Sequence, residues 1–314
     1  MSNVSSAPAF ASRPLTFAPR PVTRLQVWLA AARPRTLPAA AAPVLMGTAI
    51  AFADGRGHAP SALVTLACAL LLQIGANFVN DLVDAAKGSD TEARVGPLRV
   101  VSAGLVSPRA MTRATVGVFA LAFALGLTLV ARAGWPILAI GLASIAAAIA
   151  YTAGKRALAY LGLGDVFAFT FFGPVAVAGT HYAQTLVGSW VPVVAGVGPG
   201  LLAVALLVAN NLRDVEEDRA ANKRTLIVRL GRGFGAALYA ACHVGAALVP
   251  LGLWLATGRH AGALAAAVVV PLAWRDLVAV RTATTADVLI PVLGRTGQRM
   301  ALYGGLFALG WVMT

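Results

Sequence analysis

Nine long apolar runs, separated by short polar segments, follow one another along the chain after about residue 26. A helix needs about 20 apolar residues to cross the hydrocarbon core of a bilayer, and each run approaches that length. The pattern therefore predicts an all-α, polytopic membrane protein, a bundle of nine transmembrane helices. The expected spans are 27–52, 60–84, 110–131, 135–153, 164–184, 188–212, 234–256, 261–280 and 298–314.

Composition agrees with this pattern and sets the domain organisation. Of the 314 residues, 59% are hydrophobic and only 12% are charged, whereas soluble domains carry about 25% charged residues. The segment 1–24 contains Ser, Ala, Pro and Arg but no acid, and we expect it to be a disordered cytoplasmic tail. Residues 25–314 are then expected to form one membrane domain.

The basic residues indicate the orientation of the bundle. If the N-terminus lies inside, all Lys and Arg residues fall in inside segments except Arg56, Arg132 and Arg259. Cytoplasmic loops of membrane proteins carry such an excess of Lys and Arg. The segments that follow the second and sixth spans, which contain most of the acidic residues, are therefore expected to face the cytoplasm. The same rule explains the net charge of +13 without any binding of nucleic acid.

The acidic residues are few and concentrated, since eight of the 12 stand in two clusters. If the second span continues as a helix, Asn77, Asp81 and Asp84 share one face, with Asn80 at its edge. In the second cluster Glu216 points away from the shared face, so we expect that it is not a ligand. The residues expected on that face are Asn210, Asn211, Asp214, Glu217 and Asp218.

Such carboxylates at a membrane helix end repel one another unless a cation neutralises them. Carboxylate oxygens suit Mg²⁺, which usually shares its coordination shell with substrate phosphates. Basic residues beside both clusters could hold the same diphosphate. These are Lys87, Arg94, Arg99, Arg213 and Lys223. Solvated loop acids are the alternative for one cluster, but two clusters with shared-face spacing favour a magnesium diphosphate site.

Several strings along residues 25–314 form a recognisable set. They are Arg33-Pro-Arg-Thr-Leu-Pro38, Asn77 to Arg99 with Lys87-Gly-Ser-Asp90, Tyr151-Thr-Ala-Gly154, Leu161-Gly-Leu-Gly-Asp165, Asn210 to Asp218, Lys223-Arg-Thr-Leu226 and Pro291-Val-Leu-Gly-Arg-Thr296. Together these strings resemble the UbiA superfamily of intramembrane prenyltransferases. The departures from the family pattern are Leu82, where an aromatic residue is usual, and Ala157, where the family usually has Pro-Leu; neither removes an expected ligand.

The resemblance implies a bundle around a central cavity and a magnesium-dependent aromatic polyprenyltransferase. Mg²⁺ would bridge Asp81 and Asp84 to Asp214 and Asp218 through the diphosphate of the donor. The implied reaction transfers a polyprenyl group from polyprenyl diphosphate to 1,4-dihydroxy-2-naphthoate, with loss of CO₂ and diphosphate, and gives a demethylmenaquinone. The implied location is the bacterial plasma membrane, and no obligate protein partner is evident.

Other residues near these motifs are expected to bind substrate. Arg33 and Arg35 fit two roles equally: binding the acceptor carboxylate or diphosphate, or anchoring the helix at the membrane interface. Tyr151 and Lys155 are expected donors near the site. Asp90 and Arg94 are expected in the loop that closes over the diphosphate.

Two alternatives remain open from the sequence. The acceptor could be 4-hydroxybenzoate or another aromatic quinone precursor. A protein of a different class, an ion-coupled transporter, would also need membrane acids, but transporters usually place them near the bilayer midplane rather than at cytoplasmic helix ends.

Overall fold

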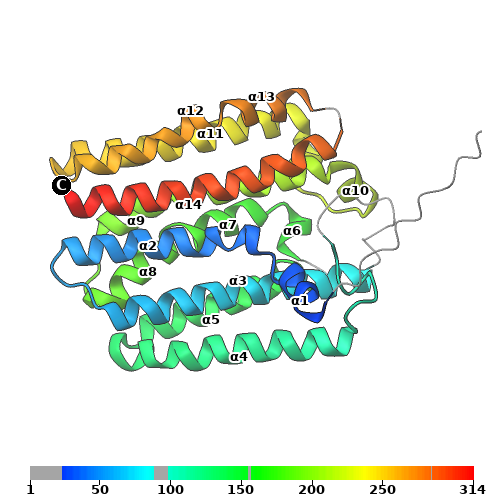
Figure 1. The fold of residues 1–314 in the computed structure, drawn as a ribbon, viewed down its shortest axis with the longest axis horizontal. Helices are drawn as coiled ribbons and strands as arrows, with labels where there is room; N and C mark the ends of the chain where they lie inside the picture. The colour runs from blue at the N-terminus through cyan, green and yellow to red at the C-terminus, as the bar shows by residue number, and fades with distance from the viewer. Residues whose placement is uncertain (1–22, 88–97, 155–156, 284) are drawn as a thin grey trace, which may run out of the picture.

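A computed structural model describes residues 23–87, 98–154, 157–283 and 285–314, and in these ranges the chain forms helices and turns without strands. The long helices run side by side between two ends of the bundle (Figure 1). The expected all-α membrane class is therefore confirmed. The helices are α1 Arg24–Ala32, α2 Pro38–Ala53, α3 Ala59–Lys87, α4 Pro108–Ala133, α5 Trp135–Ala150, α6 Leu158–Leu161, α7 Gly164–Phe172, α8 Pro174–Thr185, α9 Trp190–Arg213, α10 Val215–Ala220, α11 Leu226–Thr257, α12 Val269–Leu272, α13 Trp274–Thr282 and α14 Ile290–Met313.

Each of the nine predicted runs is largely helical, but the count of nine membrane spans is not confirmed. Within the described ranges, six helices or helix pairs are long and apolar enough to cross a membrane, or seven if the bent pair 24–36 and 38–53 is one span. The helix α5 has 16 residues and is shorter than a full span. Several predicted spans are therefore built from broken or short helices.

Local sequence signals set the helix boundaries. The side chains of Ser107, Ser189 and Thr225 accept a backbone N–H at the starts of α4, α9 and α11. Such N-caps satisfy donors that the first helical turn leaves unpaired. At Gly231 the backbone leaves the helical region with φ of 86°, so α11 is kinked three residues before the expected start of the span at residue 234.

The helix α9 lies at the centre of the bundle and α4 at its edge. Of the most apolar 18 residues, 61% are buried in α9 but only 22% in α4. The helix α9 packs most extensively against α11, and α2 packs against α14. Their shared core includes Met46, Leu202, Leu253 and Phe307, all fully buried.

An ionic network, formed by Asp276, Arg295, Arg299 and Tyr239, joins α11, α13 and α14; Asp276, Arg299 and Tyr239 are buried and Arg295 is partly exposed. Asp276 accepts hydrogen bonds from both arginines, and its contact with Arg299 joins Nη1 to Oδ2 at 2.5 Å. Arg299 also donates to the hydroxyl of Tyr239 at 2.6 Å. The opposite charges compensate one another inside the bundle, where an unpaired charge would be expensive.

Candidate functional site

The C-terminal half of α3 carries the first group of expected site residues. The helix continues unbroken to Lys87, as the shared-face argument required. Asn77 is buried and donates to the carbonyl of Ala32 at 2.9 Å and to the hydroxyl of Thr36 at 3.1 Å. Asn77 therefore ties α3 to the junction between α1 and α2.

The two aspartates of α3 hold the chain where it returns at residues 99 and 100. Asp81 is 1% exposed, and its Oδ2 accepts the backbone N–H of Val100 at 3.1 Å. Asp84 forms an ion pair of 2.6 Å with Arg99. Both carboxylates thus fix the segment that follows residues 88–97.

The end of α9 forms the second group, around Asp214. Arg213 donates to Asp214 twice, at 2.5 and 2.6 Å, and to the amide oxygen of Asn210 at 2.9 Å. The continuous helical face expected from Asn210 to Asp218 is interrupted here, because Asp214 leaves helical geometry and separates α9 from α10. The backbone N–H of Asp218 still bonds to the carbonyl of Asp214, so the turn stays compact.

Asp218 is buried and close to both acidic groups. Its Oδ1 accepts from Nζ of Lys223 at 3.0 Å, and its buried Oδ2 has no hydrogen-bond partner among the described residues. The pKa of Asp218 is raised to about 6; burial is the largest cause, Lys223 lowers the pKa, and the charges of Asp214 and Asp84 raise it. The acids of α3 therefore lie within electrostatic reach of those of α10.

Glu216 behaves differently from its neighbours. Its side chain is 71% exposed and pairs with Arg219 at 2.5 Å on the outside of the short helix α10. The structure thus turns Glu216 away from the buried acids, in the direction that the helical spacing predicts.

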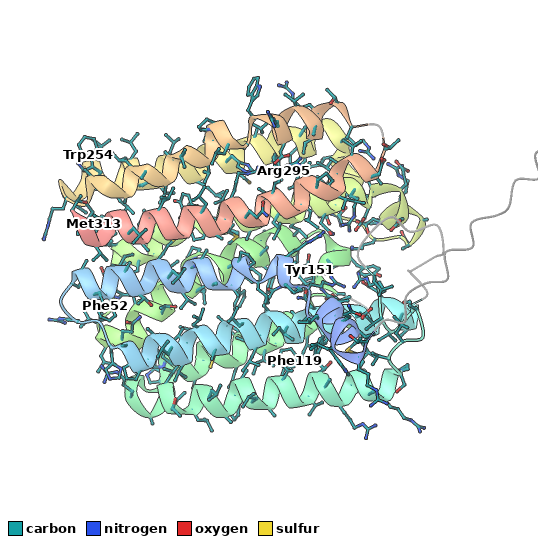
Figure 2. All side chains as sticks on the ribbon, viewed as in Figure 1. Phe52, Phe119, Tyr151, Trp254, Arg295 and Met313 are labelled. Carbon is teal, nitrogen blue, oxygen red and sulfur yellow. The ribbon has the colours of Figure 1, made fainter. Side chains whose placement is uncertain are left out.

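A cavity of about 340 Å³, here called the main cavity, opens beside these groups between α2, α3, α5, α7 and α9. Its polar end contains basic and amide side chains, and its body is lined by Ala, Leu and Phe residues. Tyr151, the residue that caps the C-terminal end of α5, is labelled in Figure 2. The expected site residues in the lining are Arg33, Asn77, Asn80, Asp84, Arg99, Tyr151, Asn210, Asn211, Arg213 and Lys223.

The structure does not bring every expected residue to this cavity. Asp81, Asp214, Asp218 and Glu217 are absent from the lining. Arg35 is exposed and also lies outside the lining. Asp90, Arg94, Lys155 and the side chain of Lys87 fall outside the described residues.

Sequence reasoning missed four polar residues of the lining as site residues, namely Thr36, Gln73, Ser144 and Thr152. Gln73 was overlooked, although it precedes Asn77 by one helical turn and donates to it at 3.4 Å. Thr36 bonds to Asn77, and Thr152 bonds to Asn80, so their roles depend on tertiary contacts.

The expected four-carboxylate metal site is not assembled in this structure. Within the described ranges, no three His, Cys, Asp or Glu side chains group closely enough to hold a metal ion. The physical reason is that Asp84, Asp214 and Asp218 each contact a cationic side chain. The donor chemistry nevertheless fits Mg²⁺, because these are carboxylates and Asp218 Oδ2 has no other described partner.

Comparisons with known proteins agree on one family. Residues 40–289 match the model of the UbiA prenyltransferase family. A protein from Mycobacterium tuberculosis named 1,4-dihydroxy-2-naphthoate octaprenyltransferase is 41% identical, over 88% of this chain and 93% of its own. The Escherichia coli protein of that name is 42% identical, over 76% of this chain and 79% of its own.

Solved structures with the same fold are more distant in sequence. A UbiA homolog from Archaeoglobus fulgidus bound to DMAPP and Mg²⁺ has a TM-score of 0.63 at 16% identity, covering 91% of this chain and 99% of its own. The apo structure of a UbiA homolog from Aeropyrum pernix K1 also has a TM-score of 0.63, at 17% identity, covering 87% of this chain and 97% of its own. At this identity the likeness establishes the fold.

Proposed function

The chain belongs to the UbiA prenyltransferase family, and from this premise we propose that it transfers a polyprenyl group from polyprenyl diphosphate to 1,4-dihydroxy-2-naphthoate. The observation that carries the proposal is a cavity with a cationic, amide-rich end and an apolar body, in a chain about 40% identical to enzymes named for that acceptor. The cationic end suits a diphosphate, and the apolar body suits a prenyl chain and an aromatic ring.

The basic residues of the lining are proposed to bind the diphosphate. Arg33, Arg99, Arg213 and Lys223 all reach the main cavity. Three of them contact aspartates in this structure, so binding of a diphosphate would exchange a carboxylate partner for a phosphate partner. Cations at the leaving group stabilise the negative charge that develops there as the C–O bond breaks.

Asp81, Asp84, Asp214 and Asp218 are proposed to hold Mg²⁺ together with the diphosphate. When bound, this ion supplies Lewis-acid stabilisation of the departing diphosphate. The remaining contribution comes from the apolar lining, which excludes water from the allylic cation until the ring attacks it. The new C–C bond forms on the ring that loses CO₂, and the product is the reduced form of a demethylmenaquinone.

The direct test is an acceptor panel with the purified protein in lipid vesicles containing Mg²⁺. We expect a prenylated product from 1,4-dihydroxy-2-naphthoate, with a mass that shows the loss of CO₂, and little product from 4-hydroxybenzoate. Product from 4-hydroxybenzoate alone would overturn the acceptor assignment, and no product from any aromatic acceptor would overturn the proposed reaction.

Variants test the proposed ligands. Asp81→Asn and Asp214→Asn should each lower kcat/KM by about 100-fold or more, the size expected when one charge-stabilising group is removed. Full magnesium-dependent turnover in both variants would contradict the proposed metal site.

A further inference from the structure

Asp165, in the first turn of α7, is a buried carboxylate that lies outside the lining of the main cavity. It is 8% exposed, and its Oδ1 has no hydrogen-bond partner among the described residues. Within the same residues it forms no ion pair, whereas four other aspartates each contact a cation, namely Asp84, Asp214, Asp218 and Asp276. An uncompensated carboxylate inside a membrane bundle is expensive, so its presence indicates a function.

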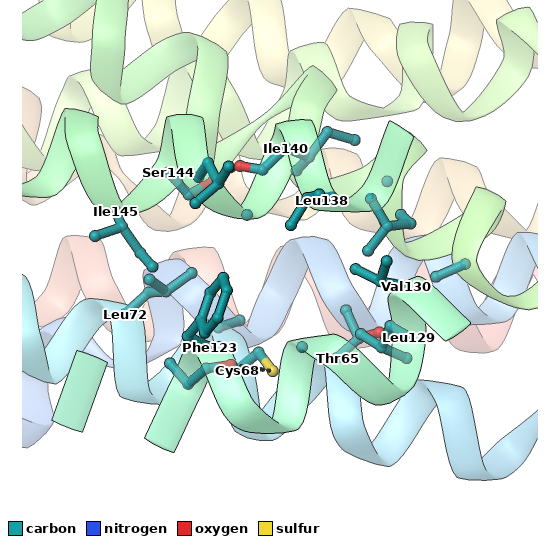
Figure 3. Close-up of a pocket in the computed structure, with 18 of the residues that line it drawn as sticks. Thr65, Cys68, Leu72, Phe123, Leu129, Val130, Leu138, Ile140, Ser144 and Ile145 are labelled. Atoms are coloured by element: carbon teal, nitrogen blue, oxygen red, sulfur yellow. Dashed lines mark hydrogen bonds between the residues drawn. The ribbon is translucent and has the colours of Figure 1, made fainter. Parts of the chain in front are cut away.

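Other polar side chains near the main cavity are satisfied locally. A smaller, apolar cavity of about 130 Å³ lies between α3, α4, α5 and α8 (Figure 3). The hydroxyls in its lining, on Thr65, Ser144 and Thr180, each donate to a carbonyl one turn earlier in their own helix, at 2.6 to 2.8 Å. Buried polar groups in folded proteins are nearly always paired in this way. Asp165 departs from this rule, so its Oδ1 can accept a hydrogen bond from a donor that turns toward it.

Helical spacing places Asp165 on the face of α7 that borders the main cavity. Ala168 and Phe172, three and seven residues further along the helix, both belong to the cavity lining. Asp165 therefore lies at the beginning of the cavity-facing side of α7.

Tyr151 connects this end of α7 to the main cavity. Its side chain belongs to the lining, and it lies against the start of α7, because a Cβ at Gly164 would be 3.2 Å from both Cε2 and the hydroxyl of Tyr151. The charge of Asp165, the next residue, acts on Tyr151 more strongly than the charge of any other acid. Tyr151 is thus the cavity side chain through which Asp165 can act.

The two other acids whose charge reaches Tyr151 are Asp218 and Asp84. Asp84 pairs with Arg99 at 2.6 Å, and Asp218 pairs with Lys223 at 3.0 Å. Asp165 has no such cation among the described residues, which leaves it as the acid best able to accept a hydrogen bond from the Tyr151 hydroxyl. A phenol hydroxyl donates one hydrogen bond and accepts up to two. If its proton points to Asp165, its oxygen can accept from a ligand in the cavity.

We propose that Asp165 is a positioning residue, which accepts a hydrogen bond from Tyr151 so that the Tyr151 oxygen accepts one from a ring hydroxyl of the aromatic acceptor. The inference rests on the proposed function and gives the main cavity its preference for a hydroxylated ring. The Tyr151–Asp165 hydrogen bond is not formed in this structure, and hydrogen bonds in enzyme sites often tighten only when the substrate binds.

The chemistry of the acceptor selects which hydroxyl is bound. In 1,4-dihydroxy-2-naphthoate, the 1-hydroxyl lies beside the carboxylate and donates to it within the molecule. The 4-hydroxyl has no such neighbour, so its O–H can donate to Tyr151. A hydroxyl that donates in this way leaves more electron density on the ring, which favours attack on an allylic cation.

Binding without a prenyl donor tests this assignment, with the purified protein in lipid vesicles. We expect 4-hydroxy-2-naphthoate to bind about tenfold tighter than 2-naphthoate, the size of one hydrogen bond. Tyr151→Phe should abolish this preference. Asp165→Asn should lower it to about threefold or less, because a neutral amide accepts more weakly than a carboxylate.

The matched control is Tyr182→Phe, which removes a hydroxyl that donates to the carbonyl of Ala133 and lies outside the main-cavity lining. This variant should keep the full preference. No preference in the unmodified protein, or a full preference in Asp165→Asn, would overturn the proposal.

Thermal unfolding separates a positioning role from a structural one. An acid in the first turn of a helix can stabilise it by interaction with the helix dipole, and in that role Asp165→Asn would unfold at a lower temperature. A buried carboxylate that serves function instead of stability gives the opposite result. We therefore expect Asp165→Asn to unfold at an equal or higher temperature, and a lower temperature together with an unchanged binding preference would overturn the proposal.

Steady-state kinetics test whether Asp165 acts through Tyr151. Tyr151→Phe should raise the KM for 1,4-dihydroxy-2-naphthoate about tenfold and change the KM for polyprenyl diphosphate by less than about threefold. The double variant Asp165→Asn/Tyr151→Phe should lose no more than Tyr151→Phe alone, since both changes remove one arrangement. Additive losses would overturn the positioning role. No turnover of any aromatic acceptor by the unmodified protein would instead overturn the proposed function, so the two failures are distinguishable.

Discussion

At the scale of single residues, burial separates the acids of the second cluster more clearly than their order in the chain. Asp218 is 6% exposed, whereas the side chain of Glu216, two positions earlier, is 71% exposed. An exposed ion pair contributes little to stability. A buried carboxylate in which one oxygen has no hydrogen-bond partner can bind a cation or a substrate group.

These two residues give a paired prediction. Asp218→Asn should lower kcat/KM by about 100-fold, because it removes a charge at the proposed diphosphate site. Glu216→Gln should change it by less than about threefold, since surface ion pairs are weak. Steady-state kinetics on both variants would check this, and equal losses would contradict the assigned orientation of α10.

Helical spacing predicted part of the site from the sequence, as Asn77 and Asp84 in the cavity lining illustrate. It could not predict that Asp81 turns to the backbone of Val100, because that contact joins residues on either side of a loop. Nor could it separate Arg33 from Arg35. The left-handed backbone at Arg33, with φ of 50°, turns the chain so that Arg33 reaches the cavity and Arg35 does not.

At the scale of helices, the long apolar runs predicted where the nine helical stretches lie but not where they break. One predicted span is divided into α7 and α8 at Gly173, directly before Pro174. Another begins with the 3₁₀ segment Ala261–Val268 before α12 and α13. Hydrophobicity alone cannot show such breaks, because the residues on both sides remain apolar.

Close packing of α8 on α9 depends on Gly196. A Cβ at this position would lie 2.6 Å from the Cα of Pro174, a backbone atom that cannot move independently. We expect Gly196→Ala to destabilise the protein by about 1–3 kcal/mol, the usual cost of overpacking. Thermal unfolding in detergent would measure it, with Gly252→Ala on α11 as a control that meets open space. Equal transition temperatures would contradict the prediction.

The ionic network around Asp276 gives a second prediction at this scale. Asp276→Asn would leave the guanidinium of Arg299, itself 5% exposed, without its carboxylate partner. Breaking a buried pair in this way usually costs about 3–5 kcal/mol. The variant should therefore unfold at a lower temperature, whereas Asp287→Asn, at an exposed position, should not. Unchanged unfolding of both variants would show that the network does not hold α13 to α14.

At the scale of the whole molecule, the bundle has two chemically different ends. The acids and cations of the site gather around the ends of α3 and α9, while the C-terminus lies at the opposite end (Figure 1). The distribution of Lys and Arg could be read from the sequence, and it favours the site end as the cytoplasmic one.

Cysteine labelling in intact cells tests this orientation. A membrane-impermeant thiol reagent should modify Arg259→Cys at the outer end and leave Arg219→Cys unmodified until the membrane is opened. The native Cys242 is buried and Cys68 is partly buried inside the bundle, so background labelling should be low. The reverse pattern would place the site on the outer side.

The apolar body of the main cavity, inside a bundle of membrane helices, also affects how encounters with the donor should be counted. A donor whose prenyl tail is dissolved in the bilayer arrives by diffusion in two dimensions, whereas the charged diphosphate that is released dissolves in water. The rate then follows the mole fraction of donor in the membrane, and adding empty lipid dilutes the substrate even when its amount per volume of suspension is constant.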